Sequence, residues 1–220
     1  MGFTAKDVKA LREQTGAGMM DCQKALTASE GDMEKAVVWL REKGKADAAK
    51  RVGRIASEGL IASYVHLGGK IGVLVEINCE TDFVARSGDF PEFCKNMCLQ
   101  ICSSAPRWVR REDIPPEVIE AERSIYRVRA KETGKPEPIL DKIADGMLQK
   151  WFKEVCLLEQ PYVRDPDRTV EDLLKELSAK VKENCSIRRF ARFQMGEGLE
   201  KRQSNLAAEV AEQLAQAKGA

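Results

Sequence analysis

The residues best suited to covalent chemistry in this chain are seven cysteines and a single histidine. Cys79 follows an apolar run and His66 precedes a Gly-Gly pair, but no pattern brings an imidazole beside a thiol, as a nucleophilic cysteine requires. Cys94, Cys98 and Cys102 are spaced four apart, which suits one face of a helix better than a C-x2-C metal site. We therefore expect reduced core cysteines, a surface histidine, and neither a metal ion nor a cofactor.

Phosphate-binding and metalloprotease motifs give no further support to an enzyme. The sequence contains no G-x4-G-K-[ST] loop, no G-x-G-x-x-G after a strand and no H-E-x-x-H. A chain without these motifs does not hold a nucleotide by its phosphates in the usual way. The sequence therefore favours a binding protein over an enzyme.

Two segments have the character of contact surfaces, and the first contains Met19 and Met20 in the run GAGMMD. Neighbouring residues on a helix point about 100° apart, so the two methionines cannot both face a small helical core. We expect one of them to be exposed, where a flexible thioether suits an adaptable binding surface. The alternative is one core methionine and one incidental surface methionine.

The second segment is CETDFVAR, residues 79–86, which follows the most apolar run of the chain. Asp82 beside Phe83 at a strand end can form a wedge, with the ring entering an apolar slot and the carboxylate competing with phosphate or with the ligands of a metal. The alternative is a helix N-terminus with Asp82 as its cap and with Phe83 and Val84 tucked beneath it.

The composition excludes a strong electrostatic field from the net charge of the whole molecule. The 220 residues include 36 Lys and Arg against 35 Asp and Glu, a net charge of +1, and the basic clusters at 107–111 and 188–189 have acidic neighbours. No apolar run reaches the ~20 residues that span a bilayer, and the start of the chain does not resemble a signal peptide. We expect a cytoplasmic protein that contacts neither a membrane nor, directly, nucleic acid.

The elements that must position these segments begin with three short helices within residues 4–44. A bundle of this size has a thin core and depends on a partner for stability. A basic, alanine-rich connector, helical or mobile, follows at residues 45–56. The helix boundaries are set by Thr4 with Asp7 at the first helix, Asp32 at the third, and Gly44 as the stop of the third.

A small antiparallel sheet with packed helices is predicted next. The runs 60–65 and 71–77 flank the Gly-Gly pair and form a hairpin, and the second run is apolar on both faces, as in a central strand. The other elements expected are a helix at 90–103, a capped helix at 169–183, a strand at 186–195 with Ile187 and Phe193 on one face, and a final helix capped by Ser204.

Residues 117–133 and 138–157 are two charged helical stretches, separated by a Gly- and Pro-containing segment that cannot continue a helix. Their apolar residues form a narrow stripe, which predicts an antiparallel coiled-coil hairpin that projects from the body. The residues expected to face each other are Val118, Ile125 and Val128 on one helix and Ile139, Ile143, Met147 and Leu148 on the other.

The predicted fold class is α+β. The chain is expected to divide into a three-helix domain at 1–50, a first core part with the hairpin and a helix at 51–116, the helical hairpin at 117–157, and a closing core part with a helix, a strand and the C-terminal helix at 158–220.

Long motifs spread along the chain carry a family resemblance. Residues 11–26 read LREQTGAGMMDCQKAL and residues 75–85 read VEINCETDFVA, and two further motifs lie at 187–201 and 207–211. These segments resemble the two signatures and the closing strand and helix of the elongation factor Ts family, and the resemblance covers nearly the whole chain.

The resemblance implies a ubiquitin-associated-like (UBA-like) N-terminal domain, an α+β core and a coiled-coil hairpin. It also implies an exchange factor that binds elongation factor Tu in its GDP-bound and nucleotide-free forms, releases GDP and performs no substrate chemistry. The site residues implied are Thr81, Asp82, Phe83 and Val84 for dislocation of Mg²⁺ from the GTPase, and Leu11, Met19 and Met20 for docking on it.

One departure concerns the core. Longer family members carry a duplicated core half, whereas this sequence has a single strand-hairpin unit before its helical hairpin. A single half buries little sheet surface, so we expect a homodimer, or two copies with two GTPases.

Two other hypotheses remain open from the residues alone. The N-terminal domain could recruit ubiquitin-like or nascent-chain partners without exchange, in which case residues 1–50 bind alone and the Asp82–Phe83 loop is dispensable. A redox enzyme centred on Cys79 or Cys185 would show fast thiol reactivity.

Overall fold

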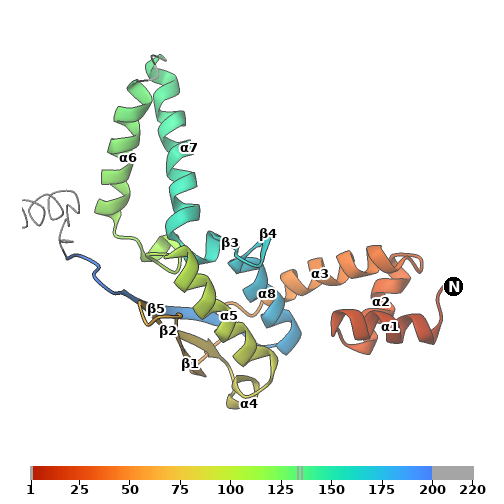
Figure 1. Cartoon of the computed structure of the whole chain (residues 1–220). Helices are drawn as coiled ribbons and strands as arrows, with labels where there is room; N and C mark the ends of the chain where they lie inside the picture. The colour runs from red at the N-terminus through yellow and green to blue at the C-terminus, as the bar shows by residue number, and fades with distance from the viewer. Residues whose placement is uncertain (1, 133, 135, 200–220) are drawn as a thin grey trace, which may run out of the picture.

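The computed structural model describes residues 2–132, 134 and 136–199. Figure 1 shows three parts: a helical bundle at the N-terminus, a sheet with helices against it, and a long helical hairpin that stands out from the body. No helix in these ranges is long and apolar enough to cross a membrane. The helix expected from Ser204 lies outside the described residues. The predicted α+β class is confirmed.

The N-terminal bundle consists of α1 (Ala5–Thr15), α2 (Met19–Ala28) and α3 (Met33–Ala49). The expected cap of α1 is present, because the Thr4 amide and hydroxyl both donate to Asp7 Oδ2, at 2.7 and 2.8 Å. Asp32 caps α3 by accepting from the Lys35 amide at 3.0 Å. The core of the bundle is small, with Val8, Leu11, Cys22, Ala25, Leu26 and Ala36 buried.

Gly44 does not end α3 as predicted, since the helix continues to Ala49. A Cβ placed on Gly44 would lie only 3.1 Å from the Cβ of Ala179, which belongs to α8 (Val170–Val181). The missing side chain therefore allows α3 and α8 to approach closely. Gly44 therefore permits close packing of two helices. From the sequence alone, a glycine at this position looked like the end of a helix.

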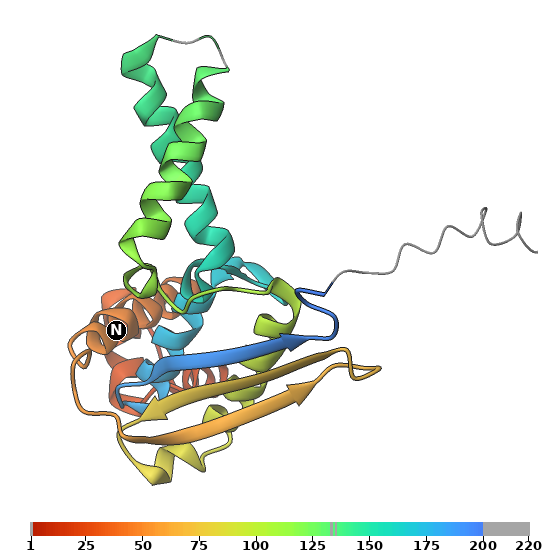
Figure 2. The ribbon, with the colours of Figure 1, turned by 90° about the vertical axis from the view of Figure 1, so that its left-hand side faces the viewer.

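The sheet contains β1 (Glu58–Val65), β2 (Ile71–Cys79) and β5 (Ser186–Gln194), in the order β1-β2-β5 with both pairings antiparallel. The expected hairpin and the central position of β2 are confirmed. Figure 2 shows the three strands side by side.

The prediction that Ile187 and Phe193 share a face is wrong. Ile187 is buried and Phe193 is 68% exposed. The register explains the difference, because Ile77 pairs with Ile187 while Glu76 pairs with Arg189, so β5 carries one extra residue at this bulge. Beyond the bulge the alternation is inverted.

The main core fills the space between the sheet, α5 (Asp89–Ser104) and α8. The thiols of Cys94, Cys98 and Cys102 are buried there, as the four-residue spacing predicted. The expected capping box of α8 is also present, with the Thr169 hydroxyl donating to Asp172 Oδ2 at 2.9 Å and accepting from the Asp172 amide at 3.1 Å.

The projecting hairpin consists of α6 (Pro116–Lys131) and α7 (Glu137–Val155), which pack against each other as predicted. The expected seam is partly wrong, since Ile125, Val128 and Ile139 are 47%, 61% and 43% exposed. The buried positions near the tip are Ala130, Leu140 and Ala144. The buried face near the tip is therefore turned away from Ile125, Val128 and Ile139. Ion pairs between Arg123 and Asp145 (3.0 Å) and between Arg127 and Asp141 (3.2 Å) cross the hairpin.

Smaller elements complete the described chain. They include a short hairpin that the sequence analysis did not predict. These elements are α4 (Asp82–Ala85), the 3-10 turns η1 (Arg111–Asp113) and η2 (Leu157–Glu159), and the strands β3 (Pro161–Tyr162) and β4 (Asp165–Thr169).

Candidate partner-binding site

The candidate wedge, residues Thr81–Val84, forms the start of the short helix α4 directly after the central strand. Thr81 caps this helix, with its hydroxyl oxygen accepting from the Val84 amide at 3.4 Å. Val84 is buried against the main core, whereas Phe83 is 85% exposed. The alternative with Asp82 as cap and Phe83 tucked under the helix is therefore wrong, and only Val84 occupies that place.

Asp82 does not lie free beside the ring. Its carboxylate forms an ion pair with Arg86, with Oδ2 2.6 Å from Nη2 and Oδ1 accepting from Nε at 3.2 Å. Both side chains are more than half exposed, so the pair is weak and exchangeable. A partner protein that places a cation more favourably can replace Arg86 beside Asp82 at little energetic cost. The local spacing of four residues on a helix is the signal that could have predicted this pair.

The backbone beneath the wedge is held by a residue that no motif singled out. Glu183, just after α8, accepts hydrogen bonds from the amides of Glu80 and Thr81, each at 3.0 Å, and from the Thr81 hydroxyl at 2.6 Å. Since 102 residues separate Glu183 from Thr81, no local pattern predicts this contact.

The candidate docking patch, Met19 and Met20, lies at the start of α2. The two side chains are 47% and 65% exposed, so both are on the surface where one was expected. Leu11 is fully buried in the bundle core. The prediction that Leu11 forms the docking patch together with the two methionines therefore needs correction, because Leu11 belongs to the bundle core.

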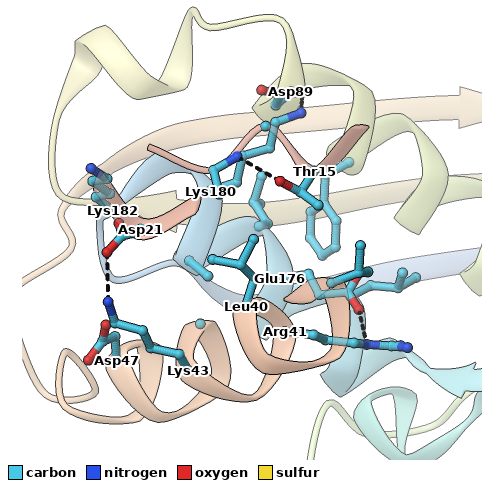
Figure 3. Close-up of a pocket in the computed structure, with 18 of the residues that line it drawn as sticks. Thr15, Asp21, Leu40, Arg41, Lys43, Asp47, Asp89, Glu176, Lys180 and Lys182 are labelled. Atoms are coloured by element: carbon cyan, nitrogen blue, oxygen red, sulfur yellow. Dashed lines mark hydrogen bonds and ion pairs between the residues drawn. The ribbon is translucent and has the colours of Figure 1, made fainter. Parts of the chain in front are cut away.

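A groove of about 800 Å³ lies between the bundle and the core. Figure 3 shows its walls, with residues from α3 on one side and from α8 and α5 on the other. Most of its charges are neutralised across or along the walls, and one of these pairs, Arg41 with Glu176, joins the bundle to the core. The pairs are Lys43 with Asp21 (2.6 Å), Arg41 with Glu176 (3.0 Å) and Lys180 with Asp89 (2.6 Å).

The thiols considered for chemistry are buried and protonated. Burial, reinforced by the charge of Glu183, raises the pKa of Cys79 to about 11, and burial raises the pKa of Cys185 to about 12. A thiol with such a pKa is a poor nucleophile at neutral pH, which removes the basis of the redox hypothesis. His66 is exposed, with Nδ1 3.0 Å from the Tyr64 hydroxyl oxygen.

The basic clusters are largely paired. Arg188 and Arg189 both donate to the carboxylate of Glu76, at 2.7 and 2.6 Å. Arg111 pairs with Glu159 and stacks over the Phe152 ring at 4.3 Å. Within the described ranges, no group of three or more His, Cys, Asp and Glu side chains could hold a metal ion. The arrangement presents contact surfaces and no assembled catalytic constellation among these residues.

Comparison with known proteins gives a consistent result. Residues 4–197 match the family model described as Elongation factor TS. The chain is 56% identical to Elongation factor Ts of Geobacter sulfurreducens over 211 residues, which covers 96% of this chain and 98% of the relative. It is 58% identical to Elongation factor Ts of Carboxydothermus hydrogenoformans, covering 95% and 96%, and 56% identical to that of Citrifermentans bemidjiense, covering 98% and 100%. The match extends over nearly the full length of each relative, and the chain belongs to the elongation factor Ts family.

Proposed function

We propose that this chain promotes GDP release from elongation factor Tu by docking through Met19 and Met20 and inserting Phe83. The family is that of the guanine-nucleotide exchange factor of translation elongation, which makes and breaks no covalent bond and works in the cytoplasm. The observation that carries the site proposal is that Phe83 is almost fully exposed although the residues around it are anchored. Thr81 is hydrogen-bonded to Glu183, and Val84 is buried in the main core.

The exchange reaction requires a difference in affinity between two states of the GTPase. GDP is held by backbone amides around its phosphates and by a Mg²⁺ ion that bridges phosphate and protein oxygens. A factor shifts this equilibrium only if it stabilises the nucleotide-free GTPase more than the bound form. Burial of Phe83 in an apolar slot that opens only in the nucleotide-free state supplies such a difference.

Asp82 contributes through charge. Its carboxylate leaves Arg86 and perturbs the polar network around the Mg²⁺ site, without itself ligating the ion. The docking patch has the complementary role of holding the factor on the GTPase in both states. Excess free Mg²⁺ therefore opposes the factor.

The test is release of fluorescent GDP from elongation factor Tu at substoichiometric amounts of this chain. The expected result is a rate that rises with factor concentration and saturates with GTPase concentration. An unchanged rate at saturating factor would overturn the proposal.

We further propose a homodimer through the outer face of the sheet, the side opposite α5. This face exposes Ile61, Leu74 and Phe193, at 71%, 47% and 68%, one from each strand. Glu76 with Arg188 and Arg189 places both signs of charge beside these apolar groups. A patch of this composition suits an identical patch across a twofold axis.

Light scattering checks the dimer. The wild-type chain is expected at twice its 24.6 kDa mass, and Leu74→Glu is expected to be monomeric with an unchanged circular dichroism spectrum. A monomeric wild type at high micromolar concentration would remove the dimer and leave the exchange proposal intact.

A further inference from the structure

The segment Lys180–Asn184, here called the α8 junction, lies between the two contact elements of the proposed function. Helix α8 ends at Val181, and Lys182 adopts a left-handed conformation with φ 62°. This backbone turn sends consecutive side chains in different directions. Beyond it, the amide of Cys185 donates to the Ser178 hydroxyl at 3.3 Å, a buried contact that closes the turn back on α8.

On one side, the junction is hydrogen-bonded to Glu80 and Thr81, here called the base of the wedge. Glu183 accepts from both the Glu80 and Thr81 amides and from the Thr81 hydroxyl, so one carboxylate satisfies three donors. Hydrogen bonds also run in the opposite direction, because the Glu80 carboxylate accepts from the Asn184 backbone amide at 2.6 Å. Charge-assisted hydrogen bonds of this kind are stronger than neutral ones and directional, so the strand end and the junction hold each other in one geometry.

The same network reaches the connector that follows the bundle. Arg54 lies with Nη1 3.5 Å from Glu80 Oε1, and its carbonyl oxygen accepts from Asn184 Nδ2 at 2.8 Å. Wedge base, junction and connector therefore meet at one point.

On the other side, the junction faces the loop that leads into the docking patch. A Cβ placed on Gly18 would lie 3.7 Å from Lys182 Nζ, and one placed on Gly16 would lie 3.3 Å from Lys180 Cε. Figure 3 draws Lys182 beside Asp21 of α2, and Lys180 on the same wall. Lys180 also pairs with Asp89 at the start of α5, at 2.6 Å. Four of the five junction residues thus lie beside the approaches to the contact elements, with Lys180 and Lys182 beside the loop before α2 and Glu183 and Asn184 beside the base of the wedge.

We infer that Glu183 is a positioning residue for nucleotide exchange, and that the α8 junction fixes the wedge in register with the docking patch so that both meet the GTPase together. This inference rests on the proposed function. Two contact elements on one rigid frame bind without having to be ordered relative to each other. A wedge that is loose at its base still docks, but its ring reaches the slot less often.

The test is a series at Glu183 measured in the exchange assay at varied GTPase concentration. Glu183→Gln keeps the side-chain length and an acceptor for the two amides but removes the charge. Glu183→Asp keeps the charge but shortens the side chain. Glu183→Ala removes the carboxylate altogether. Displacements of about 1 Å can cost up to about a hundredfold in rate, so we expect the maximal rate to fall about tenfold in the Ala variant. The KM for the GTPase should change little, because the docking patch is intact.

The ranking within the series separates reach from charge. We expect Gln to retain most of the wild-type rate and Asp to lie between Gln and Ala. If the Ala variant does not fold, the comparison of Asp with Gln carries the test alone. The matched control is Glu171→Ala, which removes a paired carboxylate within α8, 2.7 Å from Lys175, and should leave exchange unchanged.

Hydrogen exchange of the free chain gives a readout that does not depend on the GTPase. The amides of Glu80 and Thr81 should lose protection in the Asp and Ala variants while the amides of β1 and β2 keep theirs. An inactive wild type would overturn the proposed function. An active wild type with the Asp variant at the wild-type rate, or with Gln as slow as Asp, would overturn the positioning role of Glu183 alone.

Discussion

Truncation of Phe83 is the sharpest test of the wedge, because this ring contributes almost nothing to the free protein. It is 85% exposed, so nearly all of its apolar surface remains available for burial against a partner. Full burial of a phenylalanine stabilises a complex by about 2 kcal/mol. If that burial occurs only with nucleotide-free GTPase, Phe83→Ala raises the barrier to GDP release by the same amount, which slows exchange about thirtyfold.

The assay is the maximal rate of fluorescent GDP release, measured beside thermal unfolding of the free variant. The unfolding free energy should stay within about 0.5 kcal/mol of wild type, as for other exposed substitutions. Leu67→Ala is the matched control, since Leu67 is 89% exposed in the β1–β2 turn and should leave exchange unchanged. Asp82→Ala should slow exchange less than Phe83→Ala, because its carboxylate already has an exposed partner in Arg86. A Phe83→Ala rate within about twofold of wild type would show that the ring only begins a helix.

Replacing both Met19 and Met20 with Asp should weaken binding to the GTPase about thirtyfold, because apolar burial is lost, while the circular dichroism spectrum stays unchanged. An unchanged affinity would show that the docking patch lies elsewhere. Hydrogen bonds from Arg188 and then Arg189 hold the pKa of Glu76 below its ordinary 4.5. A lowered folded-state pKa adds stability above pH 4.5 that is lost as pH falls through the lower folded value, so the melting temperature of Glu76→Gln should fall less steeply below about pH 5. The seven buried thiols should react with an alkylating probe only as fast as the chain opens, and a burst at neutral pH would contradict their burial.

Local signals predicted local structure well. The caps at Thr4 and Thr169 involve partners three residues away, so their chemistry is complete within a short window of sequence. The hairpin and its central strand were likewise visible as two apolar runs around a Gly-Gly turn. These features depend on neighbours in the chain and need no knowledge of the packed molecule.

Features set by distant neighbours were missed or misread. Gly44 is a packing residue only because α8 lies against it, and the bulge in β5 is visible only in its pairing with β2. Leu11 lies in a family signature, yet burial removes it from the surface. For Phe83, local sequence allowed both a tucked and an exposed ring, and the packing of Val84 decided between them. Glu183 acts across 102 residues, and no pattern marks it.

The crossing of α3 and α8 has a consequence for how the protein can be dissected. The expected boundary at residue 50 suggests a simple cut between a helical module and the rest. At Gly44 and Ala179, however, the two helices approach too closely to leave room for another side chain, and Arg41 pairs with Glu176 beside them. A fragment that starts at residue 51 would expose this flank of α8, next to the junction that holds the wedge. We expect such a fragment to unfold at a lower temperature than the full chain and to aggregate sooner, so the bundle and core are best expressed as one unit.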